Sequence, residues 1–572
     1  MARYAQLDIA GPSPIRRAIV RIFVCAFLFL DLTQAEAQLS SQLEHIRELF
    51  GQQRWQEIVS RARPEDSPDI AFYYGTALAR LERWKEAESA FQIGQRIAPQ
   101  DPRFPIELAG VAFKQDDYAA AEKWIHRGLR LSPYDGYANN FLATVFLLEE
   151  NLEAALKYWN RTGKPQINQV SANPIPRLNP ALLDRAFVFS PASTLRLPDL
   201  LTSAARLREL NSFPASRFEL LADGQGDFDL VLHNIERNGC GGRWACLISV
   251  LGQTPAQTAN FDYYNLRSRA INFRSLFRWD AEKRWVKAEM ETPLFGEPQW
   301  HLNLDADFRN ENWAVRDGFS GPSPLLGALN LKREAVKAGF TDVISGRWQW
   351  STSTELSSRA YHDVLTGVAL DSELSRSGTQ LRQSFGITAA LLRVPEMKLT
   401  VEATANAAVA RLWSESGETY SQFEGSVRSH WFPQRAREQY EIEHAICAGK
   451  TFGSPPFDEL FTLGVLGDTS LLMRAHIATR DGKKGSAPLG RNYFLSNLEA
   501  TRNFAPFPLV KIKVGPFVDT GTLMDRQASR ESQQWLWDVG VEARVQVLGF
   551  GVALSYGRDL RSDRNALVAR PD

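Results

Sequence analysis

From about residue 263 to the C-terminus, apolar and polar residues alternate along the chain. The segments 300–308, 399–407 and 538–547 each place apolar side chains on one side and polar or charged ones on the other. A period of two is typical of β-strands with two different faces. Roughly 14 to 16 such segments lie between residues 271 and 569, enough strands to close a barrel. We therefore predict that residues 255–572 form a C-terminal transmembrane antiparallel β-barrel of about 16 strands.

The strands of a soluble two-sheet sandwich look similar when each is taken alone. Two observations favour the barrel: an N-terminal export signal, described below, and tryptophans at positions that suit the aromatic girdles of membrane barrels. These are Trp279, Trp285, Trp348, Trp350 and Trp535.

The N-terminal part of the chain carries a repeat of 34 residues. Ala87, Ala121 and Ala155 are spaced by this period, and aromatic or apolar residues recur beside them. Small residues where helices cross, repeated every 34 residues, are typical of tetratricopeptide helix pairs. We predict an all-α tetratricopeptide solenoid over residues 38–165, with a degenerate first repeat before residue 63. Such a solenoid offers a concave surface for a polypeptide substrate or a periplasmic partner protein.

Between the repeats and the barrel, residues 166–240 predict a linker and a small α/β module. The stretch 164–180 is rich in Pro and Asn and indicates a linker. Leu200 to Phe213 has the apolar spacing of a helix. Residues 217–237 indicate a hairpin whose turn contains Asp223 and Gly224.

The first 37 residues have the features of a secretory signal peptide. Arg16, Arg17 and Arg21 precede the apolar run 22–30, and residues 35–37 read Ala-Glu-Ala, which suits cleavage. A membrane anchor is the alternative, but nine apolar residues are too few to span a bilayer. The mature chain is therefore expected outside the cytoplasm, where its lipid contacts would be made by strands.

Composition narrows the functional classes. The 572 residues carry no formal net charge, which argues against nucleic acid as a partner. The hydrophobic content of 44% and the mean hydropathy of −0.29 argue against a helical membrane protein. We expect no cofactor and no metal.

Three cysteines remain after removal of the signal peptide: Cys240, Cys246 and Cys447. In an oxidising periplasm a disulfide between Cys240 and Cys246 would close a short loop. Without histidines at metal-site spacing nearby, these cysteines are interpreted as structural.

The stretch from Phe461 to Gly521 contains the candidate site. Glu499 and Asp519 lie on the polar faces of two consecutive predicted strands, and Arg474 lies in the long polar loop before them. A carboxylate inside a barrel and away from bulk water needs a cation. Arg474 is the predicted cation.

The sequence resembles the superfamily of outer-membrane barrels that carry polypeptide-transport-associated (POTRA) modules, which includes BamA, TamA and the two-partner-secretion transporters. The module within residues 166–240 is similar to a POTRA domain, and LMRAH (472–476) is similar to the family's VRGF loop motif. FVDTG (517–521) is similar to the family's FxDxG strand motif, and the acidic residue of NLEA matches Glu499.

The resemblance implies that the loop folds back into the barrel and that Arg474 contacts Glu499 and Asp519. It also assigns motif positions to Phe517 and Gly521. Ala475 stands where the family usually has glycine, and His476 ends the loop motif. Charge-assisted bonds between a guanidinium and carboxylates would hold such a loop in one place.

The resemblance implies an outer-membrane factor that translocates or inserts proteins, with repeats and POTRA-like module in the periplasm and the barrel in outer-membrane lipid. The alternative is a polysaccharide or small-solute export porin, since tetratricopeptide repeats also precede such barrels. A repeat-plus-barrel protein that delivers lipoproteins to the cell surface would share the architecture, but such proteins lack the FVDTG motif. No catalytic residues are expected: AGKT (448–451) lacks the first glycine of a phosphate loop, and we predict that the chain is not an enzyme.

Overall fold

The computed structural model describes residues 39–571 except 225–226, 241–256, 317–324, 367–371, 415–416, 435–438, 466–470, 505–509, 528–534 and 548–549. The predicted signal peptide and Cys246 lie outside these residues, so the cleavage site and the disulfide with Cys240 stay predictions. The chain forms two compact units, residues 1–145 and 146–572.

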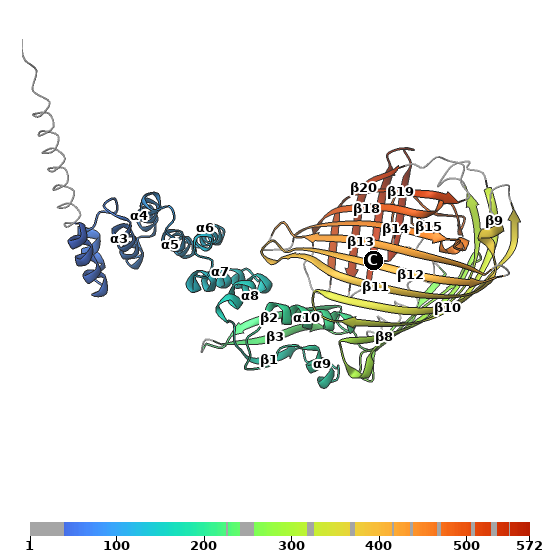
Figure 1. Ribbon diagram of the computed structural model, residues 1–572, viewed down its shortest axis with the longest axis horizontal. Helices are drawn as coiled ribbons and strands as arrows, with labels where there is room; N and C mark the ends of the chain where they lie inside the picture. Colours follow the sequence, from blue (N-terminus) through green and yellow to red (C-terminus); the bar gives the residue numbers. More distant parts are fainter. Residues whose placement is uncertain are drawn as a thin grey trace, which may run out of the picture. The chain divides into compact units, whose positions relative to one another are not determined.

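The first unit is helical. A helix over residues 39–51 precedes α2 (Trp55–Arg61), α3 (Pro68–Arg80), α4 (Trp84–Ile97), α5 (Arg103–Lys114), α6 (Tyr118–Leu131) and α7 (Gly136–Leu148), which begins in this unit (Figure 1). Side chains help to begin these helices: Ser67 accepts a hydrogen bond from Ile70 N–H, and Asp117 accepts one from Ala120 N–H.

The 34-residue period is visible in the backbone. Glu82, Asp116 and Glu150 each adopt a positive φ, between 57° and 60°, just before a helix of the repeat. Ala87, Ala121 and Ala155 have no exposed surface, as expected for small residues where helices cross. The periodic pattern of the sequence therefore corresponds to a periodic arrangement of turns and helices.

The second unit begins with α8 (Leu152–Trp159) and a small three-stranded sheet. Strand β1 (Ile167–Asn173) is followed by α9 (Pro180–Ala186), α10 (Leu197–Glu209), β2 (Ala215–Ala222) and β3 (Phe228–Ile235). The sheet order is β1-β3-β2, with β1 parallel and β2 antiparallel to β3. Leu182, Leu207 and Leu232 meet in its core. We call residues 167–235 the α/β module.

The predicted linker contains strand β1, which is a difference from the sequence analysis. Six residues between Pro165 and Pro174 pair with β3, whose backbone groups would otherwise lack partners on that side. The prolines flank the strand rather than interrupt it, which is why the segment resembled a linker. The helix and the hairpin of the module occur where the sequence predicted them.

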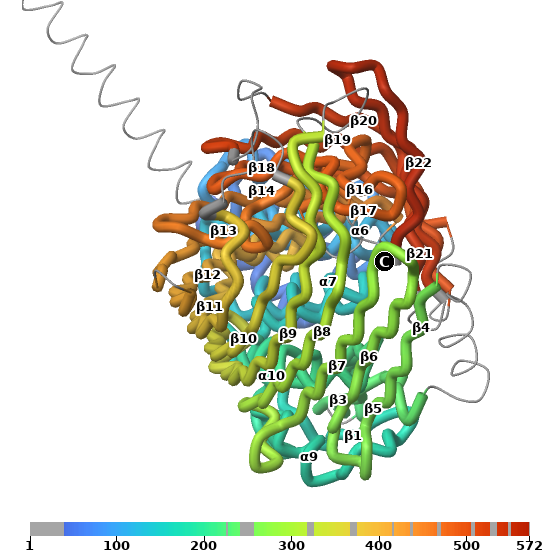
Figure 2. Tube along the Cα trace, turned by 90° about the vertical axis from the view of Figure 1, so that its right-hand side faces the viewer, coloured from blue at the N-terminus to red at the C-terminus, as the bar shows by residue number. Residues whose placement is uncertain are grey.

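Most of the second unit is one large sheet that curves into a barrel shape and has 19 strands, β4 to β22, among the described residues (Figures 1 and 2). Among the described residues, each pair of neighbouring long strands is antiparallel. The strands are β4 (Thr258–Asn260), β5 (Tyr263–Leu266), β6 (Ile271–Trp279), β7 (Lys283–Pro293), β8 (Trp300–Arg316), β9 (Leu325–Val343), β10 (Trp348–Thr366), β11 (Gly378–Val394), β12 (Leu399–Trp413), β13 (Glu418–Trp431), β14 (Tyr440–Gly453), β15 (Phe461–Thr462), β16 (Thr479–Arg480), β17 (Lys483–Lys484), β18 (Leu489–Asn503), β19 (Val510–Gln527), β20 (Trp535–Val547), β21 (Phe550–Asp559) and β22 (Asn565–Pro571).

The two faces of this sheet differ in chemistry. Its outer face exposes large apolar side chains on strand after strand, whereas the inner face carries buried charges such as Glu311, Arg359 and Glu542. Exposed outer residues include Phe277, Phe308, Val336, Leu356, Phe385, Val409, Phe423, Leu498, Val541 and Val552. No helix among the described residues is long and apolar enough to cross a membrane.

The tryptophans only partly follow the girdle prediction. Trp279, Trp348 and Trp535 are exposed, but Trp285 is 9% exposed. It lies on the inner face because the odd-numbered residues near the start of β7 point inward. There its indole N–H donates to Asp307 at 3.2 Å, and the ammonium of Lys283 lies 4.3 Å from the centre of the indole ring. The girdle prediction was therefore wrong for Trp285.

Helix α8 and the α/β module contact the strand ends of the sheet. At the turn between β11 and β12, Asn151 donates to the Pro395 carbonyl, and Lys157 and Tyr158 donate to Glu396 at 2.5 and 2.9 Å. Burial acts to raise the pKa of Glu396, but these hydrogen bonds hold it below its ordinary value. At the β9–β10 turn, Gly346 N–H donates to Thr202 of α10 at 3.0 Å.

Gly94→Ala should destabilise the helical repeats. A Cβ at position 94 would lie 2.1 Å from the ring of Phe104, which is fully buried. We expect a loss of about 1–3 kcal/mol from overpacking. Gly110→Ala is the matched control, because a Cβ there meets nothing within 4 Å and alanine is about 1 kcal/mol more favourable in a helix. Thermal melting followed by far-ultraviolet circular dichroism measures both, and equal melting temperatures would contradict the close packing.

Candidate functional site

The loop between β14 and β18 enters the interior of the curved sheet. Strands β14 and β18 pair directly, so residues 454–488 are an insertion between neighbouring strands. We call the described part of this insertion, residues 454–465 and 471–488, the inner loop. Leu463, Met473 and Ala478 of this loop have no exposed surface. Its β16 and β17 lie inside the curve of the sheet (Figure 2), and β17 pairs with β8.

Arg474 of the inner loop contacts the polar face of β18 to β20. Its guanidinium donates to both oxygens of Asp519, at 2.7 and 2.9 Å, and its backbone N–H donates to the same carboxylate at 3.1 Å. It also donates to Glu499 at 3.0 Å and to Glu542 at 3.2 Å. Arg474 is 3% exposed, so this is a buried and multiply bonded cation.

Phe517 forms the floor beneath this guanidinium. The guanidinium carbon lies 3.6 Å from the centre of the Phe517 ring, close enough for a cation–π interaction. Phe517 pairs across the sheet with Glu499 on one side and Gly540 on the other. A Cβ at position 540 would lie 2.6 Å from the ring, so only glycine leaves room for it.

Two further arginines balance the charge of this cluster. Arg544 donates to Glu499 and to Glu542, each at 2.6 Å, and Arg570 of β22 donates to Glu542 at 2.9 Å. Ser555 also donates to Glu542, at 2.6 Å. Three arginines therefore face the three carboxylates of Glu499, Asp519 and Glu542, which offsets the cost of removing these charges from water.

Ala475 makes a turn without a left-handed backbone, since it is not among the residues with positive φ. Its N–H donates to Asp538 at 2.7 Å, and its side chain is 9% exposed. The glycine usual at this position in the resembled family is therefore not required by the conformation of this loop. Gly521, the last residue of the FVDTG motif, lies on β19 opposite Leu495 and Leu536.

His476 lies between two carboxylates from neighbouring strands. Its Nδ1 is 2.8 Å from Asp538 of β20, and its Nε2 is 3.5 Å from Asp559 of β21. The three groups offer ligand atoms within 4.8 Å of one another, a spacing that suits a metal ion. The backbone N–H groups of Arg561 and Ser562 donate to Asp559, so this carboxylate already has partners in the chain.

The structure brings together Arg474, Glu499, Asp519 and Phe517, the residues that the sequence singled out for the loop. It adds Asp538, Glu542, Arg544, Asp559 and Arg570, which the sequence analysis did not assign to the site. The alternation of DVGVEARVQV already placed Asp538, Glu542 and Arg544 on one polar face. Their register with β19 places Asp538 opposite Asp519 and Glu542 opposite Gly515.

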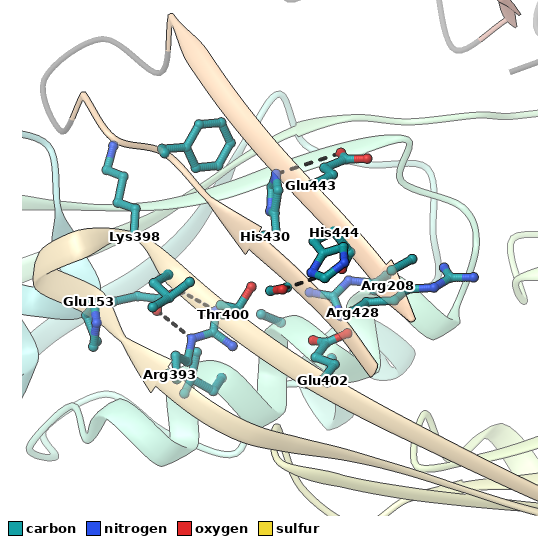
Figure 3. A pocket seen from close by; sticks show the side chains of 18 of the residues that line it. Glu153, Arg208, Arg393, Lys398, Thr400, Glu402, Arg428, His430, Glu443 and His444 are labelled. Atoms are coloured by element: carbon teal, nitrogen blue, oxygen red, sulfur yellow. Dashed lines mark hydrogen bonds and ion pairs between the residues drawn. The ribbon is translucent and has the colours of Figure 1, made fainter. Parts of the chain in front are cut away.

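A cavity of about 850 Å³ lies between this cluster and the α/β module. Its lining includes Arg474, Glu499 and Arg544 at the site and Leu201 and Arg208 of α10. Figure 3 shows Arg208, Glu402 and Arg428 around this cavity, and Arg393 paired with Glu153 of α8. Charged side chains of both signs line the cavity, together with apolar atoms of α10.

No family model and no curated protein matches the sequence. Solved structures similar to the chain include BamA from Haemophilus ducreyi lacking POTRA domains 1–3, at 12% identity and a TM-score of 0.39, covering 71% of this chain and 84% of that one. CdiB from Escherichia coli is similar at 13% identity and a TM-score of 0.44, covering 72% and 75% of the two chains. CdiB from Acinetobacter baumannii is similar at 12% identity and a TM-score of 0.41, covering 80% and 85%.

Arg474→Gln and Asp519→Asn should be strongly coupled. Each substitution leaves a buried charge without its main partner, so we expect each to destabilise the protein by about 3–5 kcal/mol. The double variant should lose less than the sum, with a coupling of about 0.5–3 kcal/mol. Urea unfolding of the purified protein, followed by tryptophan fluorescence, gives the four free energies.

Arg558→Gln is the matched control, because Arg558 forms an exposed pair with Asp563 and its substitution should leave the stability nearly unchanged. Strict additivity of the Arg474 and Asp519 substitutions would show that the two side chains act independently.

Proposed function

We propose that this chain is an outer-membrane factor that translocates or inserts proteins. Its sheet would close into a membrane-spanning barrel, with the tetratricopeptide repeats and the POTRA-like α/β module on the periplasmic side. The repeats and the module receive a polypeptide and deliver it to the barrel. The inner loop carrying Arg474 gates the barrel. The protein acts as a transporter and not as an enzyme.

The outer face of the sheet supports the membrane assignment. Val541 of β20 is 50% exposed, and Phe385 of β11 is 52% exposed. Comparable apolar residues recur on most strands between β6 and β22. Soluble proteins rarely expose such a continuous apolar surface, whereas a barrel in lipid requires it.

The observation that carries the proposal is the inner loop held inside the sheet by Arg474. A solute pore needs an open lumen, but here the inner loop is inserted between paired strands and is bonded to the inner wall through Arg474. An obstructed lumen suits a barrel that opens only when a substrate arrives. The cluster lies next to the cavity beneath the α/β module, so a segment entering from the module meets the Arg474 site first.

The α/β module offers a way to receive an extended segment. Strands β1 and β2 are the edges of its sheet, since β3 lies between them. An edge strand can pair with an incoming strand through backbone hydrogen bonds, which recognises a polypeptide independently of its sequence. A polysaccharide cannot form such a ladder, which favours protein over the alternative export porin.

Photo-crosslinking in cells tests the class of substrate. A probe at Tyr137, which is 64% exposed in the helical unit, and one at Arg428 in the cavity should both give adducts with polypeptides. A probe at Phe385 on the outer face is the control and should give lipid adducts alone. Carbohydrate adducts at Tyr137 and Arg428 would replace the proposal with polymer export.

Val541→Arg should impair membrane insertion. An arginine on the lipid-facing side near the centre of a barrel strand costs about 2–4 kcal/mol. Leu221→Arg is the matched control, because Leu221 is similarly exposed, at 47%, but lies on β2 of the module. The fraction of heat-modifiable protein in outer membranes measures both. Equal insertion of the two variants would contradict a lipid-facing β20.

A further inference from the structure

A second buried charge cluster holds the first part of the inner loop. The turn η6 (Phe457–Glu459) lies at the start of this loop. Phe457 has no exposed surface and packs edge-on against Trp313 of β8, with ring centres 4.7 Å apart. The two acidic residues that follow, Asp458 and Glu459, therefore enter the interior together with an apolar side chain.

Three arginines from three consecutive strands surround these carboxylates. Arg359 of β10 lies 3.2 Å from Asp458 and 3.1 Å from Glu459, and Arg382 of β11 lies 2.6 Å from Glu459. Arg333 of β9 lies 3.6 Å from Glu459. Tyr361 also donates to Asp458, at 2.6 Å.

The loop is needed to offset the repulsion between these arginines. Arg333 and Arg359 are direct cross-strand partners, and like charges directly opposite each other destabilise a sheet. Arg359 is 1% exposed, so water does not screen this repulsion. Asp458 and Glu459 supply the negative charge, and Glu355 pairs with Arg333 at 2.6 Å to complete the balance. The barrel wall is built to receive this acidic turn.

The two attachments of the inner loop lie on different parts of the wall. Asp458 and Glu459 bind β9 to β11, whereas Arg474 binds β18 to β20. In the strand order, β12 to β14 separate these groups on one side, and β21, β22 and β4 to β8 separate them on the other. The loop then returns to β8, where Lys484 lies 3.1 Å from Glu311.

We infer that the inner loop is a strap across the barrel with two independent anchors. The first anchor is the Asp458–Glu459 turn with its three arginines, and the second is Arg474 with its three carboxylates. In the first anchor the loop is acidic and the wall is basic, whereas in the second the loop is basic and the wall is acidic. The two anchors share no residue, so release of one leaves the other intact. Freeing Arg474 loosens the second part of the loop, and the first part continues to obstruct the lumen. Opening the lumen requires at least that both anchors are released.

This inference rests on the membrane-spanning barrel of the proposed function but not on the substrate. Thiol labelling of the purified full-length protein tests the independence of the anchors. Ala478→Cys and Leu460→Cys each place a thiol at a buried position, 0% and 7% exposed, near the second and first anchors. Adding Arg474→Gln should speed labelling at position 478 by about tenfold or more and leave position 460 unchanged, as expected of uncoupled sites.

Conductance in planar bilayers tests the obstruction. The first anchor is weakened without a net charge change by Glu459→Gln with Arg382→Gln, and the second is removed by Arg474→Gln. Each change alone should alter the single-channel conductance by less than about twofold, and all three together should raise it by about fivefold or more, because the two constraints act in series. Glu334→Gln is the control, since Glu334 is exposed beside Arg333 and points to the other face.

Two results would overturn the strap. One is equally fast labelling at positions 460 and 478 in the Arg474→Gln background. This measurement uses no substitution at the first anchor, so it does not depend on whether the Glu459→Gln and Arg382→Gln variant folds. The other is full conductance from Arg474→Gln alone. If neither occurs but no polypeptide is crosslinked in cells, the strap stands and the proposed substrate fails.

Discussion

Buried arginines constrain this structure more than any other interaction. A guanidinium stays protonated inside a protein, so each arginine removed from water must find carboxylates, aromatic faces or backbone carbonyls. Arg474 and Arg359 are 3% and 1% exposed, and each contacts carboxylates from another segment of the chain. The inner loop is the element that brings these opposite charges together. Without it, both walls would hold unbalanced charge.

The two faces of the sheet follow from one rule of strand geometry. Successive side chains point to opposite sides, so each strand offers one row to the outside and one to the interior. The outer row is apolar along β20, where Val539, Val541 and Val545 alternate with Asp538, Glu542 and Arg544. In lipid this pattern satisfies both rows at once, because the charges meet one another inside. The same alternation explains why the side chain of Trp285 on β7 points inward and donates to Asp307.

Several parts of the site could be predicted from the sequence because they depend on local patterns. The parity of KIKVGPFVD placed Phe517 and Asp519 together, and NLEA placed Glu499 on a polar face. The small residues Ala87, Ala121 and Ala155 marked the helical period. The strand β1 was missed because flanking prolines resemble a linker, and its pairing with β3 involves residues about 60 positions away. The Asp458–Glu459 anchor was missed because one short acidic turn carries no periodic signal.

The sequence by itself indicated which side of most strands is polar, where the helical repeats lie and which loop holds Arg474. These follow from covalent geometry over a few residues, since alternation and the 34-residue period need no distant partner. Only the tertiary structure decided the partners of the charges. Arg359 and Glu459 are 100 residues apart, and Arg474 and Glu542 are 68 apart. Which charges meet depends on strand register and on the path of the inner loop, and these are fixed only when the whole sheet forms around the loop.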